Sequence, residues 1–112
     1  MTTLLVVDPM NPSPRDVNLP HDVTFDVTLK DLAATPDQPV SRTLSYSLQT
    51  QTPSDILLDG AKTATRTRQI GRTDTRISAT FHVTGTGAGL ITFRVLLSDG
   101  TNELDSCLVN LR

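Results

Sequence analysis

The sequence contains no tryptophan, a single cysteine and very little glutamate or lysine. Its only lysines and glutamate are Lys30, Lys62 and Glu103, so arginine and aspartate carry almost all of its charge. Glutamate and lysine favour helices, whereas the abundant threonine favours strands. No long stretch repeats apolar residues at spacings of three and four, as an amphipathic helix would. The composition therefore predicts an all-β chain.

The lone cysteine excludes a disulfide within the chain, and no cluster of cysteine and histidine offers a zinc site. A chain of 112 residues is long enough for one domain with its own core. We expect a single domain over residues 1–112 that depends on packing alone. Cys107 alternates in phase with Val109 and Leu111, which predicts a small buried side chain rather than a reactive thiol.

The formal net charge of -2 gives no overall field that would attract nucleic acid or an anionic membrane. The apolar run at residues 4–7 is too short to span a membrane, and no basic residue precedes it as in a secretory signal. We therefore expect neither nucleic acid nor membrane as a partner. The expected location is the cytoplasm or a virus particle if the chain is complete, and extracellular if it is a domain of a larger secreted protein.

Alternating apolar and polar residues recur along the chain and predict strands. The clearest run covers residues 22–30, where Val23, Phe25, Val27 and Leu29 share one face. Further strands are expected at residues 2–7, 40–50, 56–58, 63–70, 75–83, 90–97 and 103–111. The pattern predicts an immunoglobulin-like antiparallel β-sandwich of roughly seven to eight strands, with an open barrel as the alternative.

Turn-forming residues separate these runs. Asp59-Gly60 predicts a tight turn with positive φ, and residues 51–54 predict another turn. Three prolines within residues 8–14 remove backbone donors, so this segment is expected to end the first strand and to cross between sheets or line an edge. Residues 63–70 carry arginines and predict an edge strand, because charge on an edge discourages unwanted pairing.

Three runs and one turn carry a resemblance to a known family. They are VTFDVTL at residues 23–29, TGTGAG at 84–89 leading into LITFRV at 90–95, and the turn at Asp99-Gly100. The chain resembles immunoglobulin-like modules of bacterial and phage proteins, including the CARDB type and relatives of fibronectin type III. The resemblance implies an architecture that many functions share. The sequence lacks the tryptophan, the cysteine pair and the corner tyrosine of antibody domains, which argues against the antibody type.

Nucleophilic catalysis needs a base within reach of a serine or cysteine, and only His21 and His82 could serve as that base. No GxSxG-like motif exposes a nucleophile. We therefore expect no enzymatic activity and no cofactor.

One hairpin concentrates oxygen ligands that Ca²⁺ could use, namely Asp99, Asn102, Glu103 and Asp105. Their spacing differs from that of an EF-hand loop. The simpler interpretation is that Asp99-Gly100 forms the turn and the other acids solvate its rim. A metal therefore stays a minor hypothesis.

Two sets of residues are candidates for a protein interface. Arg66, Arg68 and Arg76 are expected to share an outer face with His82, where guanidinium groups suit carboxylates or phosphates. The alternative is a solvated edge paired with nearby acids. If Ile91 and Phe93 face the core, then four leucines of the last hairpin face outward and form an apolar patch. These are Leu90, Leu96, Leu104 and Leu108.

These observations favour a non-enzymatic structural or interaction module that packs into an assembly with itself or with another protein. A component of a phage particle or similar protein shell is one specific form of this hypothesis. The alternative is an adhesion module that binds carbohydrate or a cell surface and was cut from a larger secreted protein. The scarcity of aromatic residues for stacking on sugar rings argues against that alternative.

Overall fold

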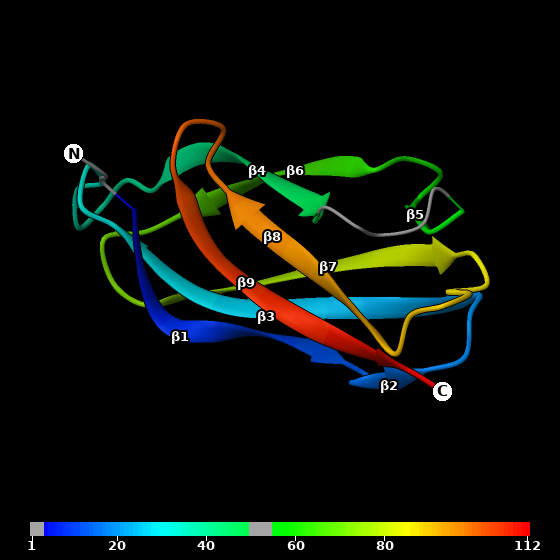
Figure 1. Ribbon diagram of the computed structural model, residues 1–112. Coiled ribbons are helices and arrows are strands. Elements are labelled where there is room, and N and C mark those ends of the chain that lie inside the picture. Colours follow the sequence, from blue (N-terminus) through cyan, green and yellow to red (C-terminus); the bar gives the residue numbers. More distant parts are fainter. Residues whose placement is uncertain (1–3, 50–54) are drawn as a thin grey trace.

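The computed structural model describes residues 4–49 and 55–112, and this part of the chain consists of strands joined by turns and loops in two layers (Figure 1). The strands are β1 (Leu4–Ser13), β2 (Asp16–Val17), β3 (His21–Asp31), β4 (Val40–Leu48), β5 (Leu57–Leu58), β6 (Thr63–Ile70), β7 (Thr75–Thr84), β8 (Thr92–Ser98) and β9 (Glu103–Leu111). The described residues include no helix with the length and hydropathy of a membrane span.

The first sheet has the order β1-β3-β7-β5, and all of its strands pair antiparallel. Its centre is the long ladder between β3 and β7, in which Phe25 lies opposite Ala79 and Val23 opposite Phe81. Buried and more exposed residues alternate from Val23 onward in β3 and along β7. This sheet therefore turns one apolar face inward and one polar face outward, as the alternation in the sequence predicts.

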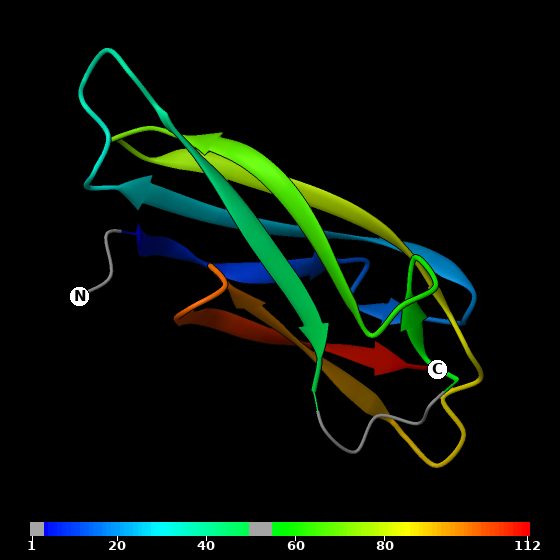
Figure 2. The ribbon, with the colours of Figure 1, turned by 90° about the horizontal axis from the view of Figure 1, so that it is seen from above.

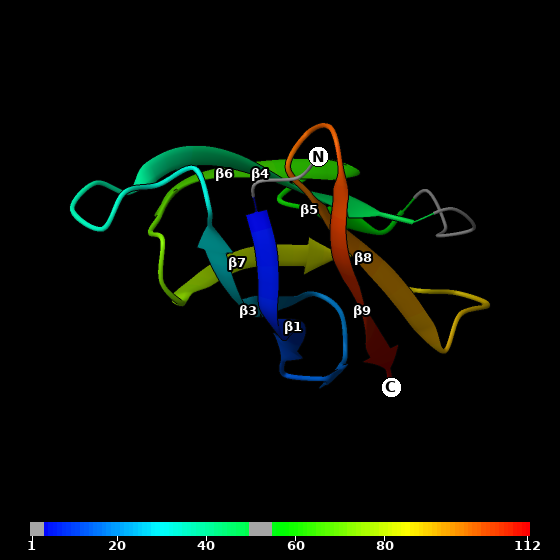
Figure 3. The same cartoon turned by 90° about the vertical axis from the view of Figure 1, so that its left-hand side faces the viewer.

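The second sheet has the order β2-β9-β8-β4-β6. Only β2 pairs parallel, so the chain passes from the edge of the first sheet at β1 to the edge of the second at β2. In Figure 2, β4 crosses β3 and β7 obliquely. Figure 3 shows β8 and β9 closing the side of the sandwich next to β1. There the N–H of Met10 donates to Oδ2 of Asp105 at 2.7 Å and connects the two sheets.

The core lies between the two sheets and contains three aromatic rings in mutual contact. Phe25 and Phe81 come from the first sheet and Tyr46 from the second. The ring centroids lie 4.9 Å apart for Tyr46 and Phe81, and 6.0 to 6.1 Å apart for the two pairs with Phe25. All three are fully buried and are the largest fully buried side chains of this core, and aromatic rings bury much apolar area each.

Most of the expected strands are present, and β6 and β9 have the expected bounds. The turn at Asp59-Gly60 is confirmed, because both residues have positive φ (49° and 85°). The first strand differs, since β1 continues through Pro9 and Pro12 to Ser13. It can do so because it is an edge strand whose pairing with β3 shifts register twice. The turn expected at residues 51–54 lies outside the described residues.

A buried carboxylate fixes the end of β3. The side chain of Asp31 is fully buried and accepts hydrogen bonds from Nε and Nη2 of Arg42 at 2.6 and 3.1 Å, and from the N–H of Ala33 at 2.9 Å. Burial alone would raise the pKa of Asp31, but these hydrogen bonds outweigh it and hold the pKa below its ordinary value. The ion pair connects β3 of one sheet to β4 of the other.

Replacing Asp31 with asparagine should lower the free energy of unfolding by about 2–3 kcal/mol at neutral pH, because Arg42 loses its carboxylate partner. The pKa of Asp31 is lower in the folded than in the unfolded chain, so the contribution is present above the unfolded pKa and is lost as the pH falls through the folded pKa. Urea unfolding should therefore show the difference from the native chain shrinking between about pH 5 and pH 2. Asp37→Asn, at an exposed aspartate, is the control and should change little.

Candidate functional site at the β6 edge

Strand β6 is the outermost strand of the second sheet, and it places two arginines on the inner side. Ala64, Arg66 and Arg68 alternate in phase with the buried Ile70, whereas the intervening residues are exposed. The arginines therefore point toward the first sheet. At the edge of a sandwich the core is thin, so a long side chain can reach past it to solvent or to the opposite sheet.

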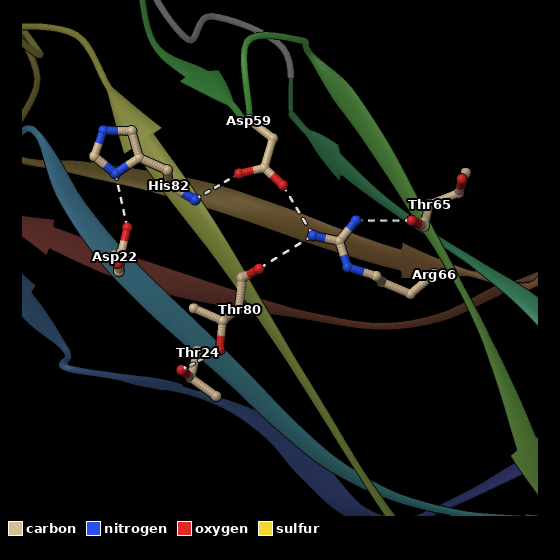
Figure 4. A network of polar contacts seen from close by, with 7 residues as sticks. All are labelled: Asp22, Thr24, Asp59, Thr65, Arg66, Thr80 and His82. Carbon is tan, nitrogen blue, oxygen red and sulfur yellow. Dashed lines mark hydrogen bonds and ion pairs between the residues drawn. The ribbon is translucent and has the colours of Figure 1, made fainter.

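Arg66 crosses from β6 to β7 and connects the two sheets (Figure 4). Its Nη2 donates to Oδ2 of Asp59 at 2.8 Å and to the carbonyl oxygen of Thr80 at 3.1 Å, and its Nη1 donates to the carbonyl oxygen of Thr65 at 2.9 Å. Its Cζ lies 4.2 Å from the centroid of the Phe81 ring. Arg66 thus extends the aromatic core with a cation–π contact and satisfies carbonyl groups of both strands.

Asp59 holds the far end of this network. Besides Arg66, its carboxylate accepts a hydrogen bond from the N–H of His82 at 2.7 Å. The bond from His82 and the bond from Arg66 together hold the pKa of Asp59 below its ordinary value. On the outer face of β7, Nδ1 of His82 lies 2.7 Å from Oδ1 of Asp22. The turn between β5 and β6 is thereby tied to β7, and β7 to β3.

Arg68 lies two residues further along β6 on the same inner face and has fewer contacts. Its Nη1 donates to the carbonyl oxygen of Thr67 at 3.0 Å, and none of the described carboxylates forms an ion pair with it. Directly opposite on β4 is Arg42, whose charge is balanced by Asp31. Arg68 therefore contributes a net positive charge to this edge.

Tyr46 lies on the same inner face of β4. Its hydroxyl group is buried and has no hydrogen-bond partner within the described residues. Burial raises the pKa of Tyr46 to about 12, although Arg68 and Arg66 oppose the rise. The effect of both arginines on Tyr46 is consistent with their inward direction.

At the open edge of β6, the backbone N–H and C=O groups of every second residue point away from β4 toward solvent. The N–H of Leu48 donates to the carbonyl oxygen of Lys62 at 2.9 Å, in register with the ladder between β4 and β6. Hydrogen-bonded and non-bonded pairs alternate in an antiparallel ladder. Arg66 and Arg68 therefore bond to β4, whereas the N–H and C=O groups of Thr65 and Thr67 point away from it. The guanidinium groups of Arg66 and Arg68 donate hydrogen bonds to the carbonyl oxygens of Thr65 and Thr67, which agrees with these carbonyls pointing away from β4.

The outer face of β4 and β6 is uncharged and rich in hydroxyl groups. Thr43 lies opposite Thr67 and Ser47 opposite Thr63, with hydroxyl oxygens 3.3 and 3.1 Å apart. The two sides of this edge therefore differ, because the inner side carries charge and the outer side carries small polar groups.

The expectation that Arg66, Arg68 and Arg76 share an outer face with His82 is wrong. Arg76 and His82 do lie on the outer face of β7, but Arg66 and Arg68 lie on the inner face of β6. The sequence held a signal for this, because both arginines are in phase with Ile70. The contacts of Arg66 with Asp59 and Thr80 were not predicted, since nothing in the sequence connects β6 with a turn residue or with a residue of β7.

The expected patch of four outward leucines is only partly present. Leu96 and Leu108 lie on the outer face, where Leu108 is 47% exposed, but Leu90 and Leu104 pack partly against the core. Leu90 precedes the start of β8, and its N–H donates to the carbonyl of Gly87. Leu104 lies at the register shift between β8 and β9, where Leu97 pairs with Asp105 and Ser98 pairs with Glu103. Alternation fails at both places, so the patch is smaller than expected.

Ile91, which was expected in the core, also lies before the start of β8, where the alternation does not hold. It is 82% exposed, whereas Phe93 and the next two residues in phase are buried as expected. Cys107 is half-buried against the core, and burial raises the pKa of its thiol to about 12. A thiol with that pKa is mostly protonated and a poor nucleophile at neutral pH.

Two of the three acids in the hairpin proposed for Ca²⁺, Asp99 and Asp105, form other contacts. Oδ1 of Asp99 accepts the N–H groups of Thr101 and Asn102 at 2.9 and 2.6 Å and thereby forms the turn. Asp105 points inward to Met10. In residues 4–49 and 55–112, no three histidine, cysteine, aspartate or glutamate residues lie together so that they could hold a metal ion.

The chain matches no protein-family model and no curated protein. Among solved structures, it is similar to the alkylpurine DNA glycosylase AlkC of Pseudomonas fluorescens, bound to DNA containing an abasic site analog. The match has a TM-score of 0.61 and 14% sequence identity, and it covers 99% of this chain and 31% of that chain. At this identity the likeness shows the fold alone, and this chain spans less than a third of that protein.

The comparison corrects one expectation. Nucleic acid was excluded as a partner because of the small net charge, and that exclusion is wrong, because net charge does not exclude DNA contact for a protein that contains this fold. A domain of the same fold forms part of a protein solved bound to DNA. A small net charge does not describe the local surface that a phosphate backbone meets.

Arg66→Met should lower the free energy of unfolding by about 1–2 kcal/mol, because it removes the ion pair with Asp59, two carbonyl bonds and the contact with Phe81 while keeping an apolar stem. Arg68→Met is the matched control on the same face and should cost at most about 0.5 kcal/mol. Urea unfolding at neutral pH measures both. Equal losses for the two variants would show that Arg66 does not join the sheets.

Proposed function

We propose that the chain is a non-enzymatic, immunoglobulin-like interaction module that binds protein partners by adding a strand at β6. The strand order supports the immunoglobulin-like assignment. β1, β3, β7 and β5 take the places of strands A, B, E and D, and β4, β8 and β9 those of C, F and G. β6 extends the second sheet beside β4, as in variable-type domains. One departure is that β5 precedes β6 in the chain.

The observation that carries the proposal is the open edge of β6. This strand is eight residues long, its Thr65 and Thr67 direct backbone donors to solvent, and no described strand pairs with this side of it. An unpaired edge of this length is a template for another chain, because main-chain hydrogen bonds supply affinity whatever the partner's sequence.

The two histidines support the non-enzymatic part of the proposal. Nδ1 of His21 contacts the carbonyl oxygen of Asp22, and Nδ1 of His82 contacts the carboxylate of Asp22. Within the described residues neither ring is hydrogen-bonded to a serine, threonine or cysteine. The pairing of nucleophile and base that acyl transfer needs is therefore not assembled there.

A capped, uncharged peptide of alternating threonine and valine should bind the β6 edge and slow amide exchange at Thr65 and Thr67. Arg66 and Arg68 should change less, because their amides already bond to β4. Amide exchange followed by NMR measures this. Thr67→Pro, which removes an edge N–H without touching the β4 ladder, should abolish binding, and Thr67→Ala should retain it. Unchanged exchange at both threonines with peptide in excess would contradict the proposal.

A second candidate function is contact with DNA as one domain of a larger protein. The observation that favours it is the fold shared with a glycosylase that was solved bound to DNA. On this chain the electrostatic contribution would come from exposed arginines such as Arg76 on the outer face of β7 and Arg94 on the outer face of β8. These lie on opposite faces, so their variants separate two modes of contact.

Fluorescence anisotropy with a duplex containing an abasic-site analogue tests the second candidate. Binding should weaken with salt, with a slope in log–log form of about −0.9 per neutralised phosphate. Arg76→Gln or Arg94→Gln should reduce that slope, according to which face meets the DNA. Absence of binding at low salt would exclude this role for the isolated chain.

A further inference from the structure

We propose that the β6 edge selects an extended segment of another protein that carries an acidic side chain opposite Arg68. This inference rests on the proposed function, since it requires that a strand is added at β6. Beyond the proposed function, it specifies the charge that the partner segment carries. The argument uses the direction of the edge groups, the unbalanced charge of Arg68 and the cost of pairing β6 with itself.

The edge offers donors more readily than acceptors. The carbonyl oxygens of Thr65 and Thr67 already accept hydrogen bonds from Arg66 and Arg68, whereas the N–H groups of these threonines face solvent without a described partner. An incoming strand meets these N–H groups first. It can then share or replace the arginine bonds to the carbonyls, because a carbonyl oxygen has two lone pairs.

The charge of the edge comes mainly from Arg68. Arg66 is balanced by Asp59, and Arg42 is balanced by Asp31. Arg68 has no ion-pair partner among the described residues, and an added strand would place one of its residues directly beside it on the inner face. Opposite charges in such a cross-strand pair are favourable, whereas like charges are unfavourable.

The same rule disfavours a second copy of this chain as the added strand. In the two antiparallel registers that pair nearly all of β6 with itself, Arg68 lies opposite Ala64, which offers no charge, or opposite Arg66, which repels it. Inward-pointing charge of this kind is a device that keeps sheet edges from pairing with themselves. A partner with aspartate or glutamate at the facing position turns that repulsion into attraction, so the edge discriminates by charge.

The outer face sets the second requirement on the partner. On the outer face, an added strand would lie beside the β6 residues Thr63, Thr65, Thr67 and Gln69, which are uncharged. The partner residues on either side of the acidic one therefore meet small polar groups, which suit threonine, serine or valine. The recognised segment is then an extended run in which an acidic residue lies between such residues on the opposite face.

Three capped peptides of alternating threonine and valine test the inference, with one central valine replaced by aspartate, asparagine or lysine. Fluorescence polarisation at low salt should give the tightest binding for the aspartate peptide, about threefold tighter than for the asparagine peptide. The lysine peptide should bind most weakly. Raising the salt should narrow these differences, because the ion pair is partly exposed.

Arg68→Glu should reverse the order so that the lysine peptide binds most tightly. Arg94→Glu is the matched control, since it makes the same change of charge on the outer face of β8 and should leave the order unchanged. Circular dichroism and urea unfolding confirm that each variant is folded.

Equal affinity of the native chain for the three peptides would overturn the inference and leave the proposed function standing. Failure of every peptide to bind, including the uncharged one, would overturn both. Reversal by Arg68→Glu would establish that this residue reads the charge of the partner, which a purely structural arginine would not do.

Discussion

Contact among three aromatic rings from two sheets is the interaction on which the rest of this structure depends. Phe25 and Phe81 belong to one sheet and Tyr46 to the other, and the lone cysteine leaves no covalent connection between the sheets. The rings fix how far apart the sheets lie. The polar connections at the margins, from Met10 to Asp105 and from Arg66 to β7, can form only because that spacing is set.

The position of Arg66 follows from this core. The Arg66 guanidinium lies over the Phe81 ring and directs its nitrogen atoms toward the carbonyl groups of Thr65 in β6 and Thr80 in β7 and toward Asp59. A lysine could balance the charge of Asp59 but could not reach several acceptors in one plane. Arg66 therefore connects the inner side of β6 to β7, while the outward N–H and C=O groups of the β6 edge remain unpaired with any described strand.

Much of the fold could be predicted from the sequence because the alternation of side chains is strict in β3, β6 and β7. The prediction failed where the strand phase ended or shifted. Ile91 lies before β8, and Leu104 occupies a register shift, so a rule of period two assigned both to the wrong environment. The arginines of β6 were misplaced for a different reason, because charged residues were assumed to face outward although Ile70 shares their phase. The contacts of Asp59 depend on tertiary structure that no local pattern records.

The four sheet margins of the described chain are unequal. β2 and β5 are two residues long, and β1 is interrupted by prolines and register shifts, so β6 alone is long and regular. A molecule with one edge strand available for pairing can end an intermolecular sheet but cannot extend it to a further molecule. Association through strands should therefore stop at one partner per chain, which separates recognition from fibre growth.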